Sequence, residues 1–95
     1  MATFVIICID KPASLDLRLA TRQAHFEYIR ANPGIVRLGG PFLDASGEMA
    51  GSLIVAEVAD QAAAQAFTDN DPYTLAGLFE RREVRPWRAT VGALP

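Results

Sequence analysis

Residues 3–10 read TFVIICID, and this apolar, β-branched stretch decides which folds the chain can adopt. Positions 4–9 hold only Phe, Val, Ile and Cys, without the alternation of polar and apolar side chains shown by a strand with one wet face. A short run of this kind is typical of a strand buried on both faces. We therefore expect residues 3–10 to lie in a sheet whose two faces are both covered.

The other elements follow this strand in an informative order. Hydrophobic periodicity and the breaks between segments predict helices at residues 14–31, 61–70 and 71–81, and strands at residues 35–42, 52–58 and 83–91. The two helical pieces after residue 60 follow each other directly, so the order is βαββαβ. This order predicts an α+β protein with the ferredoxin-like fold, in which helices cover one face of an antiparallel sheet.

Residues at the breaks indicate how these elements begin and end. Three residues stand at expected N-cap positions: Ser14, Asp60 and Asp71. The sequence NPG at residues 32–34 ends the first helix, because proline cannot continue it and glycine can take the left-handed conformation. GGP at residues 39–41 predicts a bulge or a strand end, and Pro86 predicts an edge strand or a bend.

A single ferredoxin-like domain would leave the second face of its sheet open to water. The strands at residues 3–10 and 52–58 are apolar on both faces, and exposing their Val, Ile and Leu side chains would forfeit several kcal/mol at about 25 cal/mol per Å². Apolar patches of that kind mark interfaces. We therefore expect two copies to pack sheet against sheet as a homodimer, which in this fold is a dimeric α+β barrel.

Composition excludes several classes of protein. The chain has 95 residues, 51% of them hydrophobic and 21% charged, with a net charge of −2, which is the profile of one globular domain spanning residues 1–95. There is no basic footprint for nucleic acid and no apolar run long enough to cross a membrane. The N-terminal residues do not match a secretory signal, so we expect a cytoplasmic protein.

Cofactors and metals find little support in the sequence. One histidine and one cysteine are too few for a metal site of the usual kind, and no Walker or Rossmann glycine pattern is present. We therefore expect neither a metal nor a bound cofactor. Cys8 lies within the apolar stretch that opens the chain, so we expect a buried, unreactive thiol rather than a nucleophile.

The first predicted helix combines an apolar stripe with a polar flank. The stripe is formed by residues at spacings of four, seven and three, and we expect it to face the core: Leu15, Leu19, Phe26 and Ile29. Arg18, Arg22 and His25 fall within about one 60° sector on one flank of that stripe. The two arginines can form an anion-binding corner at the seam between helix and sheet, or they can simply extend their charged heads into water.

His25, the only histidine, has two readings. It can be a structural histidine with satisfied hydrogen bonds, or a general acid/base if a carboxylate orients its ring. Asp71 is a candidate partner, although its position before Pro72 already explains it as a helix cap. Asp10 can join the same polar cluster or merely close its strand beside Lys11.

Taken together, these segments resemble the YciI-like (YCII-related) family. The resemblance rests on the ordered set of an apolar strand ending in Asp10, RLATRQAHFEYI at residues 18–29, LGGPF at 38–42, GSLIVAEV at 51–58, DPYTLAGLF at 71–79 and VRPW at 84–87. It implies a dimeric ferredoxin-like α+β barrel and a His-Asp pair as active site. By motif position these are His25 and Asp71, with Ser52 and the two arginines nearby. One branch of the family is similar to a dehydrochlorinase acting on a chlorinated hydroxyquinol.

Three functions remain open at this point. The first is a small cofactor-independent enzyme, of lyase, isomerase or dehydrochlorinase type, in which His25 and Asp71 perform acid/base chemistry on a small oxygenated metabolite, cyclic or halogenated in some cases. Arg18, Arg22, Ser52 and Asp10 would then bind that substrate. The second is a dimer that binds a small molecule without catalysis, and the third is a purely structural dimer module.

Overall fold

The chain forms one antiparallel sheet and a layer of helices. The computed structural model describes residues 1–93, and positions 94–95 of the predicted domain lie outside the described residues. Within that range the elements are β1 Ala2–Asp10, α1 Leu15–Ala31, β2 Val36–Leu43, β3 Met49–Val58, α2 Gln61–Asp69, α3 Pro72–Leu75 and β4 Phe79–Pro86.

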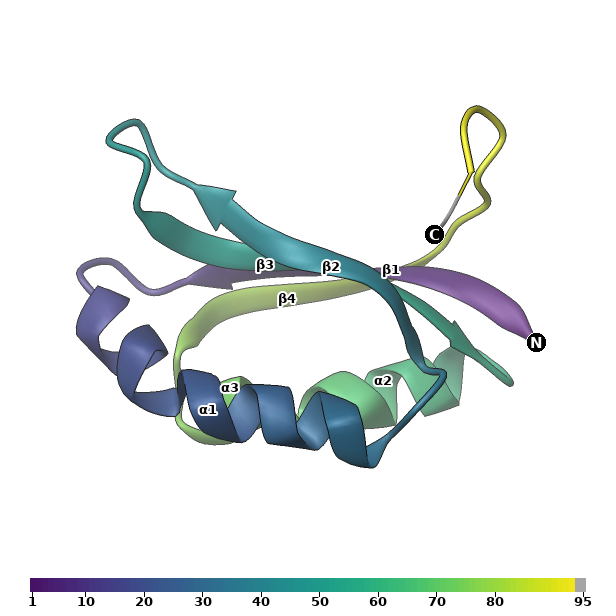
Figure 1. Cartoon of the computed structure of the whole chain (residues 1–95), viewed down its shortest axis with the longest axis horizontal. Helices are drawn as coiled ribbons and strands as arrows, with labels where there is room; N and C mark the ends of the chain where they lie inside the picture. The colour runs from purple at the N-terminus through teal and green to yellow at the C-terminus, as the bar shows by residue number, and fades with distance from the viewer. Residues whose placement is uncertain (94–95) are drawn as a thin grey trace.

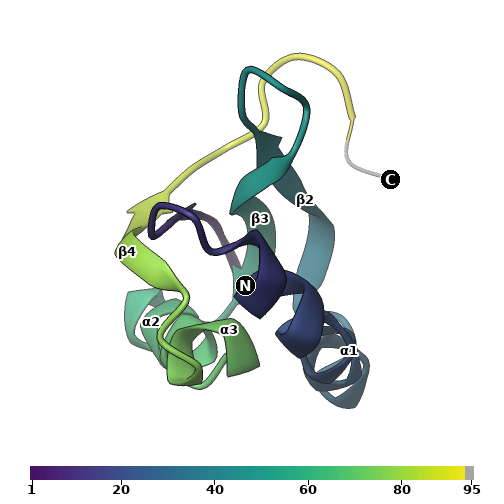
Figure 2. The same cartoon turned by 90° about the vertical axis from the view of Figure 1, so that its left-hand side faces the viewer.

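The strand order of the sheet is β2-β3-β1-β4, with every neighbouring pair antiparallel. In Figure 1 the helices lie below the sheet and no helix covers its upper face. Figure 2 shows α1 beneath the β2–β3 side and α2 with α3 beneath the β4 side. This arrangement confirms the predicted ferredoxin-like α+β fold, and it puts β4, which ends at Pro86, at an edge of the sheet as expected.

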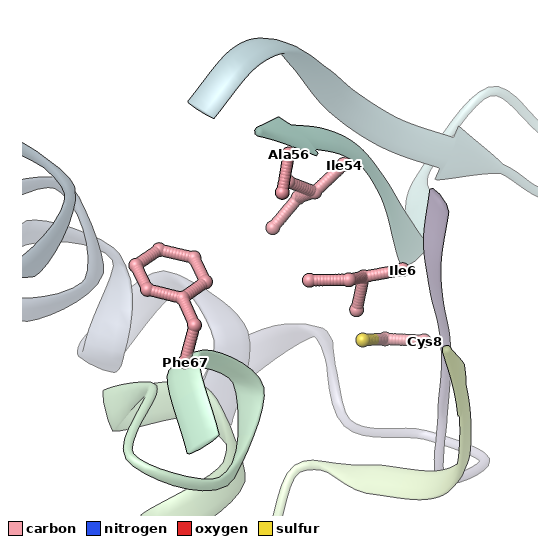
Figure 3. Packing of buried hydrophobic residues seen from close by; sticks show 5 residues of the cluster. All are labelled: Ile6, Cys8, Ile54, Ala56 and Phe67. Atoms are coloured by element: carbon pink, nitrogen blue, oxygen red, sulfur yellow. The ribbon is translucent and has the colours of Figure 1, made fainter. Parts of the chain in front are cut away.

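The core lies between β1, β3 and α2. Ile6 and Cys8 of β1 and Ile54 and Ala56 of β3 point toward Phe67, which reaches up from α2 (Figure 3). All five side chains are buried, and a large apolar side chain in such a place contributes about 1.5–3 kcal/mol. Cys8 is 1% exposed, which confirms the expected buried thiol.

Within one copy of the chain, the two faces of β1 are not equally covered. Phe4 and Ile6 point toward the helices and are buried. Val5 and Ile7 point to the opposite, open face and are only half-buried. On the same open face, Leu53 of β3 is exposed. The face opposite the helices is therefore an apolar surface.

The end of the sheet differs from the prediction at β4. The sequence predicts a helix through residues 79–81 and a strand over 83–91, but β4 is Phe79–Pro86. Gly77, with φ 75°, ends the short α3, and pairing of Phe79 with Asp10 starts the strand there. Because this pairing runs between distant parts of the chain, the local pattern of residues 79–85 does not reveal it.

Strand irregularities also differ in place from the prediction. β2 and β3 begin at Val36 and Met49, and Gly39–Pro41 pairs regularly with Ser52–Ile54 inside β2. The register shifts lie on either side of this segment, so the predicted interruption at GGP is wrong. Gly51 has a packing reason, because a Cβ atom there would collide with the Cys8 carbonyl.

The most deeply buried side chains of α1 are polar, which corrects the predicted orientation of this helix in part. Leu19 and Phe26, expected in the core, are 49% and 41% exposed, whereas Arg18 and His25 are buried. Ile29 packs against the core as expected, and Leu15 is partly buried. A helical stripe of apolar residues normally turns inward. Here the hydrogen-bond partners beneath the helix, Asp10 for Arg18 and Asp71 for His25, outweigh that tendency.

Helix ends agree in part with the sequence. Asp60 and Asp71 cap α2 and α3 by accepting hydrogen bonds from the backbone N–H groups of Ala63 and Tyr73. Ser14 occupies the N-cap position of α1 but makes no capping bond; its hydroxyl donates to the Pro12 carbonyl instead. None of the helices within residues 1–93 is long and apolar enough to cross a membrane.

Candidate active site

A buried ion pair connects the end of β1 to the first turn of α1. Arg18 donates from Nε to Asp10 Oδ2 at 2.7 Å and from Nη2 to Asp10 Oδ1 at 2.9 Å. Nη2 also donates to Ser52 Oγ at 2.9 Å. Asp10 and Ser52 share the helix side of the sheet because Ser52 pairs with Cys8, two residues before Asp10. Asp10 thus joins the polar cluster.

This ion pair keeps Arg18 charged inside the protein. The residue is 3% exposed, so burial opposes its charge, but the hydrogen bond and negative charge of Asp10 outweigh that effect and raise the pKa of Arg18. Two-point hydrogen bonding also fixes the plane of the guanidinium. Of the two possibilities for the arginines, the one in which the charged head extends into water therefore does not apply to Arg18.

The second buried pair joins α1 to the start of α3. His25 Nδ1 lies 2.9 Å from Asp71 Oδ1, and Asp71 Oδ1 also accepts from the backbone N–H of Tyr73 at 2.9 Å. Asp71 is 2% exposed. The capping position of Asp71, which the sequence alone explains structurally, is thus also the position that brings its carboxylate to the imidazole.

The chemistry of Asp71 selects one tautomer of His25. A carboxylate accepts hydrogen bonds and cannot donate them, so the proton of the neutral imidazole resides on Nδ1. Nε2 then carries the lone pair, and no hydrogen-bond partner for Nε2 occurs among residues 1–93. The His25 side chain remains 9% exposed. An imidazole held in this way can accept a proton through Nε2.

Tyr73 links the two buried pairs, and sequence reasoning did not single it out. Its ring stacks on the His25 imidazole, with centroids 4.2 Å apart and planes 20° apart. The Arg18 guanidinium carbon lies over the same ring, 4.6 Å from its centroid. Burial raises the pKa of the Tyr73 phenol, so it stays protonated near neutral pH. The sequence feature that could have identified Tyr73 is its position directly after Asp71 and Pro72 at the start of α3.

Arg22 is positioned differently from Arg18 and His25. It is exposed, and its guanidinium carbon lies 5.2 Å from the centroid of the Phe26 ring. The side chain borders a small cavity of about 70 Å³ beside the polar cluster, lined by Arg18, Arg22, Phe26, Gly40, Pro41, Met49, Ser52, Ile54 and Tyr73. Two arginines and no carboxylate line this cavity, so it favours an anion or a partly negative oxygen.

His25 stands just behind the wall of this cavity. Its ring contacts two of the lining residues, Tyr73 and Phe26, with centroid distances of 4.2 and 5.7 Å. Asp10 and Asp71 lie behind Arg18 and His25, where they orient their partners rather than contact the cavity. Within residues 1–93, no three His, Cys, Asp or Glu side chains gather closely enough to hold a metal ion.

Comparison with known proteins gives a consistent result. The family model of the YCII-related domain matches residues 2–88. The chain is 36% identical over 93 residues to Protein YciI of Escherichia coli and, equally, to Protein YciI of Shigella flexneri, covering 90% of this chain and 95% of each relative.

Solved structures extend the comparison to a ligand complex. The 5-chloro-2-hydroxyhydroquinone dehydrochlorinase of Burkholderia phenoliruptrix AC1100, in complex with 2,5-dihydroxybenzoquinone, superposes with a TM-score of 0.86 and 32% identity. The match covers 93% of this chain and 95% of that one. A putative antibiotic biosynthesis monooxygenase from Nitrosomonas europaea matches with a TM-score of 0.55 and 19% identity, which shows a shared fold alone.

Proposed function

The chain belongs to the YCII-related family, and from this premise we propose that it is a small acid/base enzyme whose active site is the cluster around His25. The observation that carries the proposal is the 2.9 Å contact between His25 Nδ1 and Asp71 beside a cavity lined by two arginines. Such a pair supplies an oriented base, and the arginines supply positive charge where a substrate oxygen becomes negative.

The proposed chemistry uses only groups of this chain. His25 Nε2 would take a proton from a substrate that reaches it between Tyr73 and Phe26, while Asp71 stabilises the imidazolium that forms. Arg18, held by Asp10 and Ser52, would face the developing negative oxygen from a fixed position. A positioned base of this kind accelerates proton transfer by about 10²- to 10⁴-fold, enough for substrates that are already activated.

The substrate we propose is a small oxygenated ring, halogenated in some cases. Support comes from the structural relative at 32% identity, which acts on 5-chloro-2-hydroxyhydroquinone and binds 2,5-dihydroxybenzoquinone. In a dehydrochlorination, a base removes one proton, the released electron pair forms a double bond and chloride leaves with the pair of the C–Cl bond. This elimination needs neither an oxidant nor a reductant, so it suits the acid/base groups present.

We propose further that the working unit is a homodimer joined through the face of the sheet that the helices leave open. That face carries a hollow of about 450 Å³ whose lining is largely apolar: Val5, Ile7, Leu38, Leu53, Val55, Arg85, Pro86 and Trp87. A second copy would remove these side chains from water and cover the other side of β1, as its sequence requires.

The function is tested by turnover and binding measured on the same variants. A panel of cyclic enols, lactones and halogenated hydroxyquinols is offered to the wild type and to His25→Ala, and 2,5-dihydroxybenzoquinone binding is followed by calorimetry. We expect His25→Ala to lose about 10²- to 10⁴-fold in kcat while still binding the quinone. Equal turnover by both proteins would refute the acid/base role, and binding without turnover in the wild type would favour a non-catalytic binding dimer.

Asp71 provides a matched pair of variants that separates capping from catalysis. Asp71→Asn keeps an oxygen that can accept from the Tyr73 N–H but removes the charge beside His25, whereas Asp71→Ala removes both. We expect both to lose kcat, but only Asp71→Ala to lose about 1 kcal/mol of stability in urea unfolding. If Asp71→Asn keeps full activity, the carboxylate has only its capping role.

A further inference from the structure

Tyr73 occupies the space between the two functional side chains of α1. Arg18 and His25 are seven residues apart, which puts their α-carbons two helical turns, about 10 Å, apart on one face of the helix. Their side chains pack against the Tyr73 ring at 4.6 and 4.2 Å. One ring in contact with both side chains fills a gap of that size.

The ring is itself held firmly. Tyr73 is 2% exposed, Phe79 contacts it edge-on with centroids 6.0 Å apart, and its backbone N–H donates to Asp71. The same residue therefore touches the His25 imidazole with its ring and the Asp71 carboxylate with its backbone. A hydrogen bond through Nδ1 alone would leave the imidazole free to swing about that bond, because one contact does not define a plane.

We propose that Tyr73 is a positioning residue: its ring sets the plane of the His25 imidazole and separates it from Arg18, so that Nε2 keeps one orientation. The inference rests on the proposed function for its catalytic consequence, but the order of the imidazole does not depend on any substrate. The phenol hydroxyl interacts with Arg18 and has no part in holding the imidazole. Because the aromatic ring orients the imidazole, Tyr73→Phe should retain this role and Tyr73→Leu should lose it.

The test measures the imidazole directly by NMR, since His25 is the only histidine and its signals need no assignment among others. We expect Tyr73→Leu to increase the mobility of the His25 Cε1–H group in ¹³C relaxation and to accelerate exchange of the Nδ1-bound proton with water. With a substrate from the panel, kcat should fall about 10²-fold while KM changes little, because a misplaced catalytic group costs about that much. Tyr73→Phe should restore both properties to near the wild-type values.

Tyr28→Leu is the matched control, because the Tyr28 ring stacks on Phe67 at 5.0 Å and its hydroxyl donates to the Phe67 carbonyl. It should destabilise the fold yet leave the mobility of the His25 imidazole unchanged. An ordered imidazole in folded Tyr73→Leu overturns the proposal. So does a disordered one in Tyr73→Phe, which decides the matter even if Tyr73→Leu does not fold. If no substrate is turned over but the imidazole loosens as expected, the positioning role stands and the proposed enzyme function fails.

Discussion

Buried ionisable side chains of α1 are matched by specific partners. Arg18 has Asp10, and His25 has Asp71, each at hydrogen-bond distance inside the protein. The Arg18 charge without Asp10 would cost several kcal/mol, and Asp71 stabilises α3 as its cap. Each pair therefore supports the fold and is also a candidate functional group. This double role explains why a stability loss in a variant of these residues says nothing by itself about catalysis.

Cys8 gives a residue-scale prediction about pH. Burial raises the pKa of its thiol from 9.0 to about 11. Because the folded-state pKa is the higher one, the unfolded chain ionises first: the stabilisation is complete below about pH 9 and is lost as the pH rises to about 11. The loss should be about 2–3 kcal/mol, since each pKa unit corresponds to about 1.4 kcal/mol.

The measurement compares urea unfolding of the wild type and Cys8→Ala between pH 8 and 11. Cys8→Ala lacks the ionisable group, so the stability difference between the two proteins should shrink as pH rises through this range. Parallel stability curves would contradict the prediction and would mean that the thiolate is accommodated in the folded protein.

At the scale of elements, the Asp10–Arg18 pair fastens α1 to the end of β1. The loop between them, residues 11–14, turns the chain back so that the first turn of α1 lies over Asp10. The inward direction of two polar side chains of α1 follows from this connection: once Arg18 points inward, His25 two turns later must do so too. The outward direction of Leu19 and Phe26 is the consequence.

The strength of this fastening is testable by a double-mutant cycle. Asp10→Leu leaves the Arg18 charge buried without its counterion and should destabilise the protein by about 3–5 kcal/mol. Asp10→Leu combined with Arg18→Met removes both charges and should recover a large part of that loss. Urea unfolding of the single and double variants measures the coupling, and additive losses would show that the two side chains do not stabilise each other.

Figure 1 shows one face of the sheet without a helix, and the side chains that line the hollow on this face are largely apolar. The proposed dimer predicts how this face behaves. The wild type should sediment at twice the chain mass of 10.3 kDa. Leu53→Arg, on the open face, should shift it toward the monomer, because a buried unpaired charge is costly at an interface. Leu75→Arg, on the exposed surface of the helix side, is the control and should not. A wild-type monomer at tens of micromolar would refute the dimer.

The sequence by itself determined the type and order of the elements, because apolar runs, Gly and Pro breaks and capping aspartates act locally. It also predicted that Cys8 would be buried and that Asp71 would cap a helix. It failed where distant segments decide. β4 starts at Phe79 because it pairs with β1, and residues 79–81 show no sign of this in their own pattern.

Only the tertiary structure decided how the polar residues meet. Helical spacing placed Arg18, Arg22 and His25 on one flank of α1, but it could not show that two of them turn inward and the third stays exposed. That choice depends on Asp10, Ser52 and Asp71, which come from three other parts of the chain. These contacts join side chains 8 to 46 residues apart and exist only in the packed molecule. The free energy of burying ionisable groups as pairs depends on both partners, so the local propensity of one segment does not include it.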